Sequence, residues 1–197
     1  MNLGLKKITR KTGQEIFLSK TESKKIRLLD FWQWSTSDLL TNTTRGILAE
    51  FIVATDLGVD GILQNDWESY DLTSKNGIKI EVKASAYIQT WQQAKLSKIT
   101  YSIRPSKKYN SKINRFDGKP QRHSDFYIFC LLHHKDQKTI NPLDLDQWSF
   151  YVLNTRILDK KLPNQKTITL SSLLKLNPVK CKYGQINNVL NVQKNAT

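Results

Sequence analysis

Two acidic residues and one lysine in the middle of this 197-residue chain have the types and spacing needed for phosphate chemistry. Asp71 is followed ten residues later by Glu81, and Lys83 comes two residues after that. Carboxylate oxygens bind hard divalent cations such as Mg²⁺, and an amine beside them can act on an attacking water or a scissile phosphate. The same residue types are common on a solvated hairpin, so the pattern alone leaves both interpretations open.

These residues must be positioned by a β-hairpin. From Ile78 to Lys83 apolar and charged residues alternate strictly, which is the period of a half-buried strand. The turn sequence Ser74-Lys75-Asn76-Gly77 separates this strand from Tyr70-Asp71-Leu72. Glu81 and Lys83 should therefore share one face of the second strand.

The register of the hairpin decides whether the two carboxylates meet. If the loop is residues 75–77, with Gly77 left-handed, Asp71 lies opposite Glu81 with side chains roughly 5 Å apart. If the turn has only two residues, Asp71 pairs with Val82 and points away from Glu81. A metal site requires the first register, or a bulge that restores it.

A helix is predicted upstream over residues 42–58, with Thr43 or Thr44 as N-cap and Gly58 as the C-terminal stop. Its middle is apolar on almost every side, so it should be largely buried. Glu50 is the one charge in that stretch, and a buried carboxylate needs a partner. A metal ion or its bound water is one candidate, and a salt bridge to Arg45 or to a lysine is the other.

Together, these residues resemble the PD-(D/E)XK nuclease superfamily. In that family a helix with a glutamate precedes a hairpin that carries Asp and then Glu-x-Lys, which is the order found here in Glu50, Asp71, Glu81 and Lys83. The family's proline before the aspartate is replaced by Tyr70. The resemblance covers about residues 42–153 and implies an α/β fold with a restriction-endonuclease-like core, a mixed β-sheet flanked by helices (αβββαβ-type).

The resemblance also implies the role of each residue. Asp71, Glu81 and the carbonyl of Val82 would bind Mg²⁺ or Mn²⁺, and Glu50 would add an outer ligand or hold a metal-bound water. Lys83 would orient or help deprotonate the attacking water and stabilise the charge that develops on the phosphate. Two polar residues of the following stretch are candidates for a supporting position near the active site: Ser85 and Gln89.

Charge points to a polyanionic partner. The formal net charge is +14, from 31 Lys+Arg against 17 Asp+Glu, and neutralising a phosphate releases counterions. An AT-rich genome would also enrich lysine. The positions of the charged residues along the chain are therefore more informative than the net charge. Residues 104–122 form a basic, aromatic-punctuated run opposed only by Asp117, predicted to be a loop along DNA, with a merely solvated loop as the alternative. The predicted DNA-binding residues are Arg104, Lys107, Lys108, Lys112 and Arg115.

The length predicts a single nuclease domain over residues 1–197, with basic N-terminal and C-terminal extensions around the core. Residues 87–95 are predicted to be helical. No apolar run reaches membrane-spanning length and no signal-peptide pattern is present, so we expect a cytoplasmic protein without membrane contact. Buried strands are predicted at Ile99–Ile103, Phe126–Leu132 and Trp148–Leu153.

The sequence predicts a Mg²⁺- or Mn²⁺-dependent endodeoxyribonuclease acting in restriction or phage defence. The alternatives are a non-catalytic DNA-binding module on the same fold, a DNA-repair nuclease, and an RNA-directed nuclease. The presence of all four site residues favours the enzyme, because a binding module has no use for carboxylates that face a phosphate. Cutting both strands would need two active sites, which makes a homodimer one arrangement to expect.

Overall fold

The structure is a computed structural model that describes residues 6, 8–21, 25–63, 68–110 and 115–195. The chain divides into two compact units, Met1–Leu39 and Leu40–Thr197. The smaller unit contains helix α1 (Leu28–Thr36), in which no residue is buried. The larger unit holds every residue of the candidate site. Whether the chain works as one nuclease domain stays a prediction.

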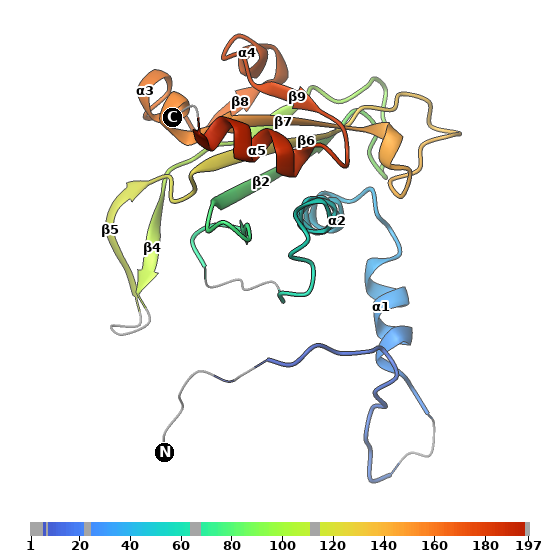
Figure 1. The fold of residues 1–197 in the computed structure, drawn as a ribbon. Coiled ribbons are helices and arrows are strands. Elements are labelled where there is room, and N and C mark those ends of the chain that lie inside the picture. Colours follow the sequence, from blue (N-terminus) through green and yellow to red (C-terminus); the bar gives the residue numbers. More distant parts are fainter. Residues whose placement is uncertain (1–5, 7, 22–24, 64–67, 111–114, 196–197) are drawn as a thin grey trace. The chain divides into compact units, whose positions relative to one another are not determined.

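A five-stranded mixed sheet is the centre of the larger unit (Figure 1). Its strand order is β1-β2-β6-β7-β9, in which β2 and β6 are parallel and the other neighbours are antiparallel. The predicted α/β fold class, with a mixed sheet flanked by helices, is confirmed. The strands are β1 (Leu72–Thr73), β2 (Lys79–Ala86), β6 (Phe126–Leu132), β7 (Trp148–Asn154) and β9 (Val179–Cys181).

Helices and a second, smaller sheet cover the two faces of this sheet. Helices α2 (Asn42–Leu57) and α5 (Ile186–Asn195) pack on one face. Four elements from the second half of the chain cover the other face. These are β3 (Thr100–Ser102), α3 (Thr155–Lys161), β8 (Thr167–Thr169) and α4 (Leu170–Leu174), with a short 3-10 helix (Leu145–Gln147) preceding β7.

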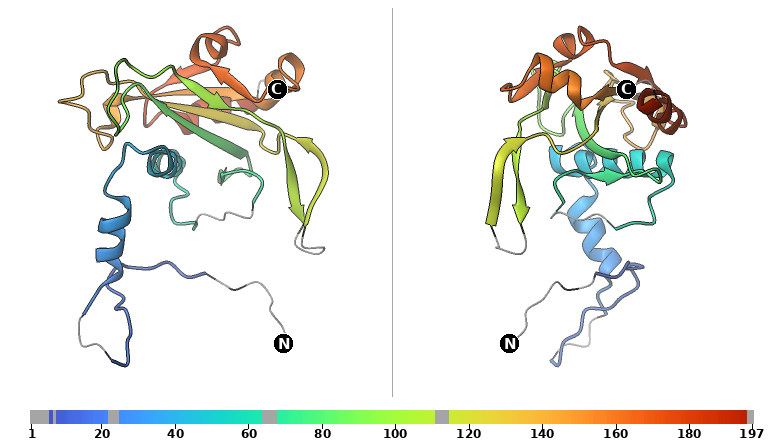
Figure 2. Two further views of the ribbon diagram at one scale, coloured as in Figure 1. Left: turned by 180° about the vertical axis from the view of Figure 1, so that it is seen from behind. Right: turned by 60° about the vertical axis from the view of Figure 1, so that its left-hand side comes forward.

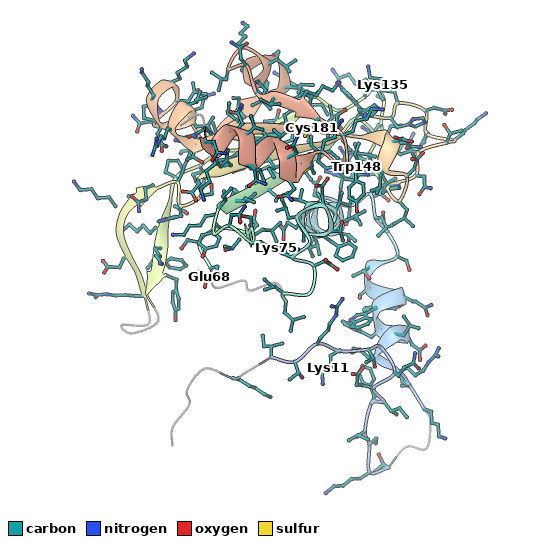
Figure 3. All side chains as sticks on the ribbon, viewed as in Figure 1. Lys11, Glu68, Lys75, Lys135, Trp148 and Cys181 are labelled. Carbon is teal, nitrogen blue, oxygen red and sulfur yellow. The ribbon has the colours of Figure 1, made fainter. Side chains whose placement is uncertain are left out.

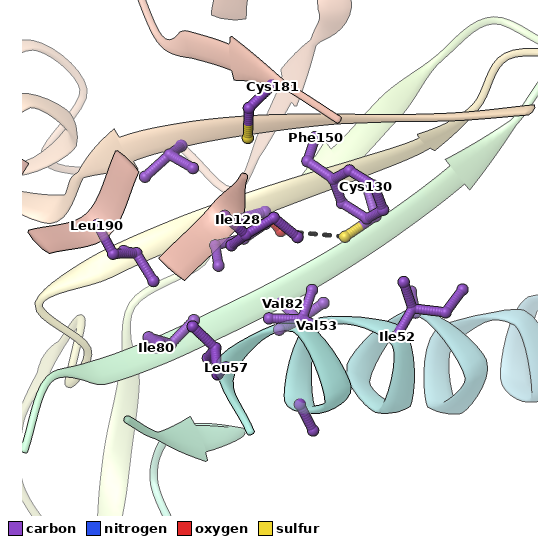
Figure 4. Packing of buried hydrophobic residues seen from close by; sticks show 14 of the residues in the cluster. Ile52, Val53, Leu57, Ile80, Val82, Ile128, Cys130, Phe150, Cys181 and Leu190 are labelled. Carbon is purple, nitrogen blue, oxygen red and sulfur yellow. Dashed lines mark hydrogen bonds between the residues drawn. The ribbon is translucent and has the colours of Figure 1, made fainter. Parts of the chain in front are cut away.

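Strand β6 is buried along its whole length, as its continuous apolar sequence predicted. Alternate residues serve the two cores: Ile128 and Cys130 pack toward α2 and α5, whereas Phe129 packs toward β3 and β8. Figure 4 shows the first of these cores, with Val53 of α2 and Val82 of β2 among its members. The odd-numbered residues of β2, which include Glu81 and Lys83, therefore lie on the opposite face from α2 and α5.

Helix α2 begins and ends close to the predicted limits. The N-cap is Thr41 rather than Thr43 or Thr44, because the Thr41 side chain accepts from the N–H of Thr44. Gly58 ends the helix in the left-handed region with φ 63°, as predicted. A Cβ at Gly58 would stand 2.7 Å from Nζ of Lys75, so the lysine of the hairpin turn crosses the end of the helix (Figure 3).

Two expectations about the connections were wrong. Residues 87–95 contain no helix, and the segment bends. Residues 104–122 are not a loop, because β4 (Ser106–Asn110) and β5 (Arg115–Gln121) pair as a two-stranded antiparallel ribbon. Figure 2 shows this ribbon projecting from the main sheet. None of the described helices is long and apolar enough to cross a membrane.

Candidate active site

The β1–β2 hairpin adopts the first of the two registers. Leu72 pairs with Ile80 and Thr73 pairs with Lys79. Gly77 has φ 75° and donates its N–H to the carbonyl of Ser74 at 2.9 Å, so the loop consists of residues 75–77. A non-glycine residue would be strained at that φ, which explains why this turn fixes this register. The register that a metal site requires is therefore the one observed.

Asp71 is held at the edge of the sheet by the backbone of β2. Its Oδ2 accepts the N–H of Val82 at 2.7 Å, and its own N–H donates to the carbonyl of Ile80 at 3.0 Å. The N–H and C=O of one strand residue point to the same edge, so the carbonyl of Val82 faces the side on which Asp71 lies. Asp71 and this carbonyl, two of the predicted metal ligands, thus share one edge.

Lys83 brings the two carboxylates together. Its Nζ lies 2.7 Å from Oε1 of Glu81 and 3.5 Å from Oδ2 of Asp71. The three side chains keep between 20% and 27% of their surface exposed, so a phosphate group can reach them from solvent. The structure therefore gathers Asp71, Glu81 and Lys83 into one accessible cluster.

The electrostatics of the cluster show a shortage of positive charge. Burial raises the pKa of Glu81, the charge of Asp71 raises it further, and Lys83 only partly opposes them. Burial acts to lower the pKa of Lys83, but the negative charges of Asp71, Glu81 and Glu50 outweigh it and raise that pKa above its ordinary value. Lys83 is consequently an ammonium at neutral pH in this state, a cation and proton donor rather than a base.

Glu50 lies within electrostatic reach of the cluster but is not gathered into it. It is half-buried on α2, and its charge contributes to the raised pKa values of Lys83 and Cys130. Across the described ranges, no group of three or more His, Cys, Asp or Glu side chains is close enough to hold a metal ion. Asp71 and Glu81 are thus the carboxylates that share the ammonium of Lys83.

Arg45, one proposed partner of Glu50, makes several other contacts. Its buried guanidinium donates to the carbonyl of Leu40 at 2.6 Å, to Oδ1 of Asn42 at 2.6 Å and to Oε1 of Gln89 at 3.0 Å. Gln89 is itself buried and donates to the carbonyl of Ala86 at 2.9 Å. This network joins the first turn of α2 to the end of β2. Sequence reasoning missed it, although a lone arginine in an apolar helix was a signal of a buried structural contact.

Two polar residues predicted to support the active site, Ser85 and Gln89, both lie at or just after the end of β2. Gln89 accepts a hydrogen bond from Arg45, which stands in the first turn of the helix that carries Glu50. Ser85 is buried and, by strand alternation, lies on the same face of β2 as Glu81 and Lys83.

The predicted DNA-binding residues occupy a ribbon instead of a loop. Lys107 and Lys108 lie on β4 and Arg115 begins β5, all with exposed side chains, and Arg104 is exposed just before β4. Lys112 lies outside the described residues. The basic character predicted for the surface is thus present on the ribbon, in a different secondary structure.

Arg122, at the end of the predicted basic run, is not available to phosphate. Its guanidinium is buried and donates to the carbonyls of Ile103 and Leu162, both at 2.9 Å, and to Oδ1 of Asp159 at 2.7 Å. This arginine therefore anchors the base of the ribbon. Composition alone could not reveal it, because its partners lie up to 43 residues away in sequence.

The donor set fits a hard divalent cation. Two carboxylates already converge on one ammonium, and burial together with the charge of Asp71 raises the pKa of Glu81, so an added cation at this position would be favourable. Mg²⁺ is usually bound in proteins through one or two carboxylates, with water or phosphate oxygens completing its coordination. The residues present match that pattern of few protein ligands better than they match a closed cage.

A mixed α/β sheet with an acidic pair and a lysine at its edge is a nuclease-like core. Comparison with protein families agrees: residues 2–172 match the family described as bacteriophage T4 endonuclease IV. The match covers most of the chain, and the protein belongs to this endonuclease family. A comparison with curated proteins found no match.

Proposed function

We propose that this endonuclease is a metal-dependent endodeoxyribonuclease of the PD-(D/E)XK type, with its active site at Asp71, Glu81 and Lys83. The single observation that carries the proposal is the convergence of both carboxylates on one ammonium, at 2.7 Å and 3.5 Å. This requires the three-residue turn and a shared strand face. An ordinary solvated hairpin has no reason to bury three charges together.

Asp71, Glu81 and the carbonyl of Val82 would hold Mg²⁺ or Mn²⁺. When bound, the metal would polarise the scissile phosphate and lower the pKa of a coordinated water. Lys83 would donate hydrogen bonds to the phosphate oxygens and stabilise their developing negative charge. Glu50, at longer range, would keep Lys83 protonated and could hold a water at the margin of the site.

DNA is the proposed substrate, and restriction or phage defence is the proposed setting, with DNA repair as the alternative. The net charge of +14 and the exposed cations Lys107, Lys108 and Arg115 on the ribbon support a polyphosphate partner. A homodimer would supply the second active site that a double-strand cut needs. Localisation in the cytoplasm remains an expectation.

One observation favours a second candidate, a DNA-binding module without catalysis. Lys83 is already ion-paired with both carboxylates, and among the described residues no group of three or more His, Cys, Asp or Glu side chains is placed to hold a metal ion. Such a site could be a structural ion pair. The two candidates differ in what a divalent metal does, because only the enzyme needs one.

The test is a cleavage assay with purified protein, supercoiled plasmid and linear DNA, in Mg²⁺, Mn²⁺ or EDTA, with RNA as a parallel substrate. We expect cleavage of DNA in Mg²⁺ or Mn²⁺ and none in EDTA. Cleavage that persists in EDTA overturns metal dependence, and preferential cutting of RNA overturns the substrate. DNA binding without any cleavage, in every metal tried, leaves the binding module as the function.

A further inference from the structure

The β4–β5 ribbon has two faces of different chemistry. Tyr109 pairs directly with Phe116, and Lys108 pairs with Asp117. Because successive residues of a strand point to opposite faces, Arg115 lies on the face of Lys108, and the two aromatic residues lie on the other. One face of the ribbon is therefore charged and mainly basic, and the other is aromatic.

Phe116 is exposed, but a neighbouring ring holds its side chain in one orientation. It keeps 66% of its surface accessible, although it stands on a strand of otherwise polar or small residues. Its ring packs against Tyr109 with centroids 5.6 Å apart and an interplanar angle of 69°, an edge-to-face contact. Such pairs have a preferred geometry, so Tyr109 fixes the direction of the ring while leaving most of it open to a partner.

The charge of the ribbon indicates which class of molecule it binds. Lys107 and Lys108 are exposed on β4 and Arg115 on β5. Exposed cations attract a polyanion, because each phosphate that they neutralise releases counterions. A nucleic acid combines negative charge with flat rings, so it offers a counterpart both to the cations of the ribbon and to its exposed aromatic ring. Aromatic side chains stack on bases of any sequence.

We propose that Phe116, held edge-on by Tyr109, stacks on a nucleobase of bound DNA, while the cations of the ribbon attract the DNA by its negative charge. This inference rests on the proposed function, since it assumes that DNA is the substrate. The stack would hold the strand in register with respect to the ribbon. Phe116 is thus a binding residue, whereas Tyr109 positions it.

The test uses DNA oligonucleotides that carry 2-aminopurine at successive positions, bound to the whole protein in EDTA, with gels confirming that the DNA stays intact. Stacking on an aromatic ring quenches 2-aminopurine fluorescence. We expect quenching confined to one or two adjacent positions with wild-type protein. With Phe116→Leu this quenching should disappear and affinity should fall about 5- to 100-fold, with Phe116→Trp restoring both.

Two control variants separate stacking from charge and from general loss of an aromatic ring. Lys108→Gln combined with Arg115→Gln should weaken binding and reduce its salt dependence, but the position of quenching should remain. Tyr183→Leu removes a partly exposed ring outside the ribbon and should change nothing.

Unchanged affinity and unchanged quenching in Phe116→Leu, in a protein that binds and cuts DNA, would overturn the stacking alone and leave the nuclease intact. Absence of DNA binding by wild type would overturn both. A fall in affinity with quenching retained would also count against stacking, because it would show that Phe116 supports the ribbon and does not touch a base.

Discussion

The ammonium nitrogen of Lys83 lies 2.7 Å from Oε1 of Glu81, its neighbour two residues earlier on β2. Their side chains share a face because a strand repeats every two residues. The pair is partly buried, so its attraction is screened less than that of a surface ion pair. This contact holds Lys83 close to both carboxylates.

Lys83→Ala should reduce DNA cleavage by about 10²- to 10³-fold, the usual loss when one group that stabilises transition-state charge is removed. DNA binding should change little, whereas the melting temperature should fall, because two partly buried carboxylates lose the cation that they share. Steady-state cleavage and binding titrations measure both quantities. Lys180→Ala is a matched control, because Lys180 is exposed on β9 with its ammonium over the ring of Tyr151. Full cleavage by Lys83→Ala would remove this lysine from the mechanism.

Glu50→Gln should leave the metal-free protein as stable as wild type or slightly more stable, because nearby like charges destabilise an empty acidic site. It removes attraction to Lys83 but also removes repulsion from Asp71 and Glu81. The stabilisation by Mn²⁺, which scales as RT ln(1 + [L]/Kd), should be smaller than in wild type. Melting curves in EDTA and in Mn²⁺ measure both effects.

A buried salt bridge at Glu50 predicts a different result. In that case Glu50→Gln should cost about 3 to 5 kcal/mol without metal, because a cation is left without its partner. A large loss in EDTA with an unchanged Mn²⁺ shift would place Glu50 outside the active site.

Replacing Lys107 and Lys108 by glutamine should weaken DNA binding and flatten its salt dependence. Each lost phosphate contact reduces the slope of log K against log salt by about 0.9 for duplex DNA. Binding titrations at several salt concentrations provide the slope. Lys138→Gln, an exposed lysine outside the ribbon, is the control. An unchanged slope would mean that the ribbon is merely solvated.

Arg122→Met should destabilise the protein instead of changing the salt slope. The Arg122 side chain is only 1% exposed and donates hydrogen bonds to the carbonyls of Ile103 and Leu162. Its removal therefore leaves buried acceptors unpaired. We expect a loss of about 3 kcal/mol in denaturant unfolding, from unsatisfied acceptors that cost about 1 to 3 kcal/mol each with partial relaxation. Wild-type stability with a reduced salt slope would instead make Arg122 a phosphate contact.

The two cysteines should be almost unreactive in the native protein. Burial raises the pKa of the Cys181 thiol to about 11 and raises that of Cys130 well above its ordinary value. A pKa of about 11 leaves on the order of one thiol in a thousand ionised at pH 8, and only the thiolate reacts. Iodoacetamide labelling followed by mass spectrometry should be slow until denaturant is added. Rapid native labelling would contradict this burial.

The parts of the fold that could be predicted depend on local signals. Gly77 in a three-residue turn determines the hairpin register, and the unbroken apolar run of Phe126–Leu132 determines a doubly buried strand. Both signals lie within a few residues of their structural effect. The contact of Asp71 with Glu81 and Lys83 follows from the first of them.

The parts that could not be predicted depend on distant contacts. The ribbon is exposed on both faces, so β4 and β5 lack the alternation of apolar and polar residues that identifies a strand. The burial of Arg122 depends on Asp159, 37 residues away, and on carbonyl groups, which leave no trace in side-chain composition. Residues 87–95 look polar and helical, but hydrogen bonds from Gln93 to the carbonyl of Tyr87 and to Ser97 hold them in a bend.

The hydrogen bond from Val82 N–H to Asp71 also limits how the sheet can grow. Strand β1 has only two residues, and beyond it the Asp71 carboxylate takes the place of a backbone acceptor. An unpaired N–H on a strand edge is a template for pairing with another chain. Asp71→Ala would therefore remove a metal ligand and open a site for aggregation at once, whereas Asp71→Asn keeps an oxygen that can accept from Val82. The candidate catalytic aspartate thus also satisfies an edge N–H of β2 that would otherwise be open to pairing with another strand.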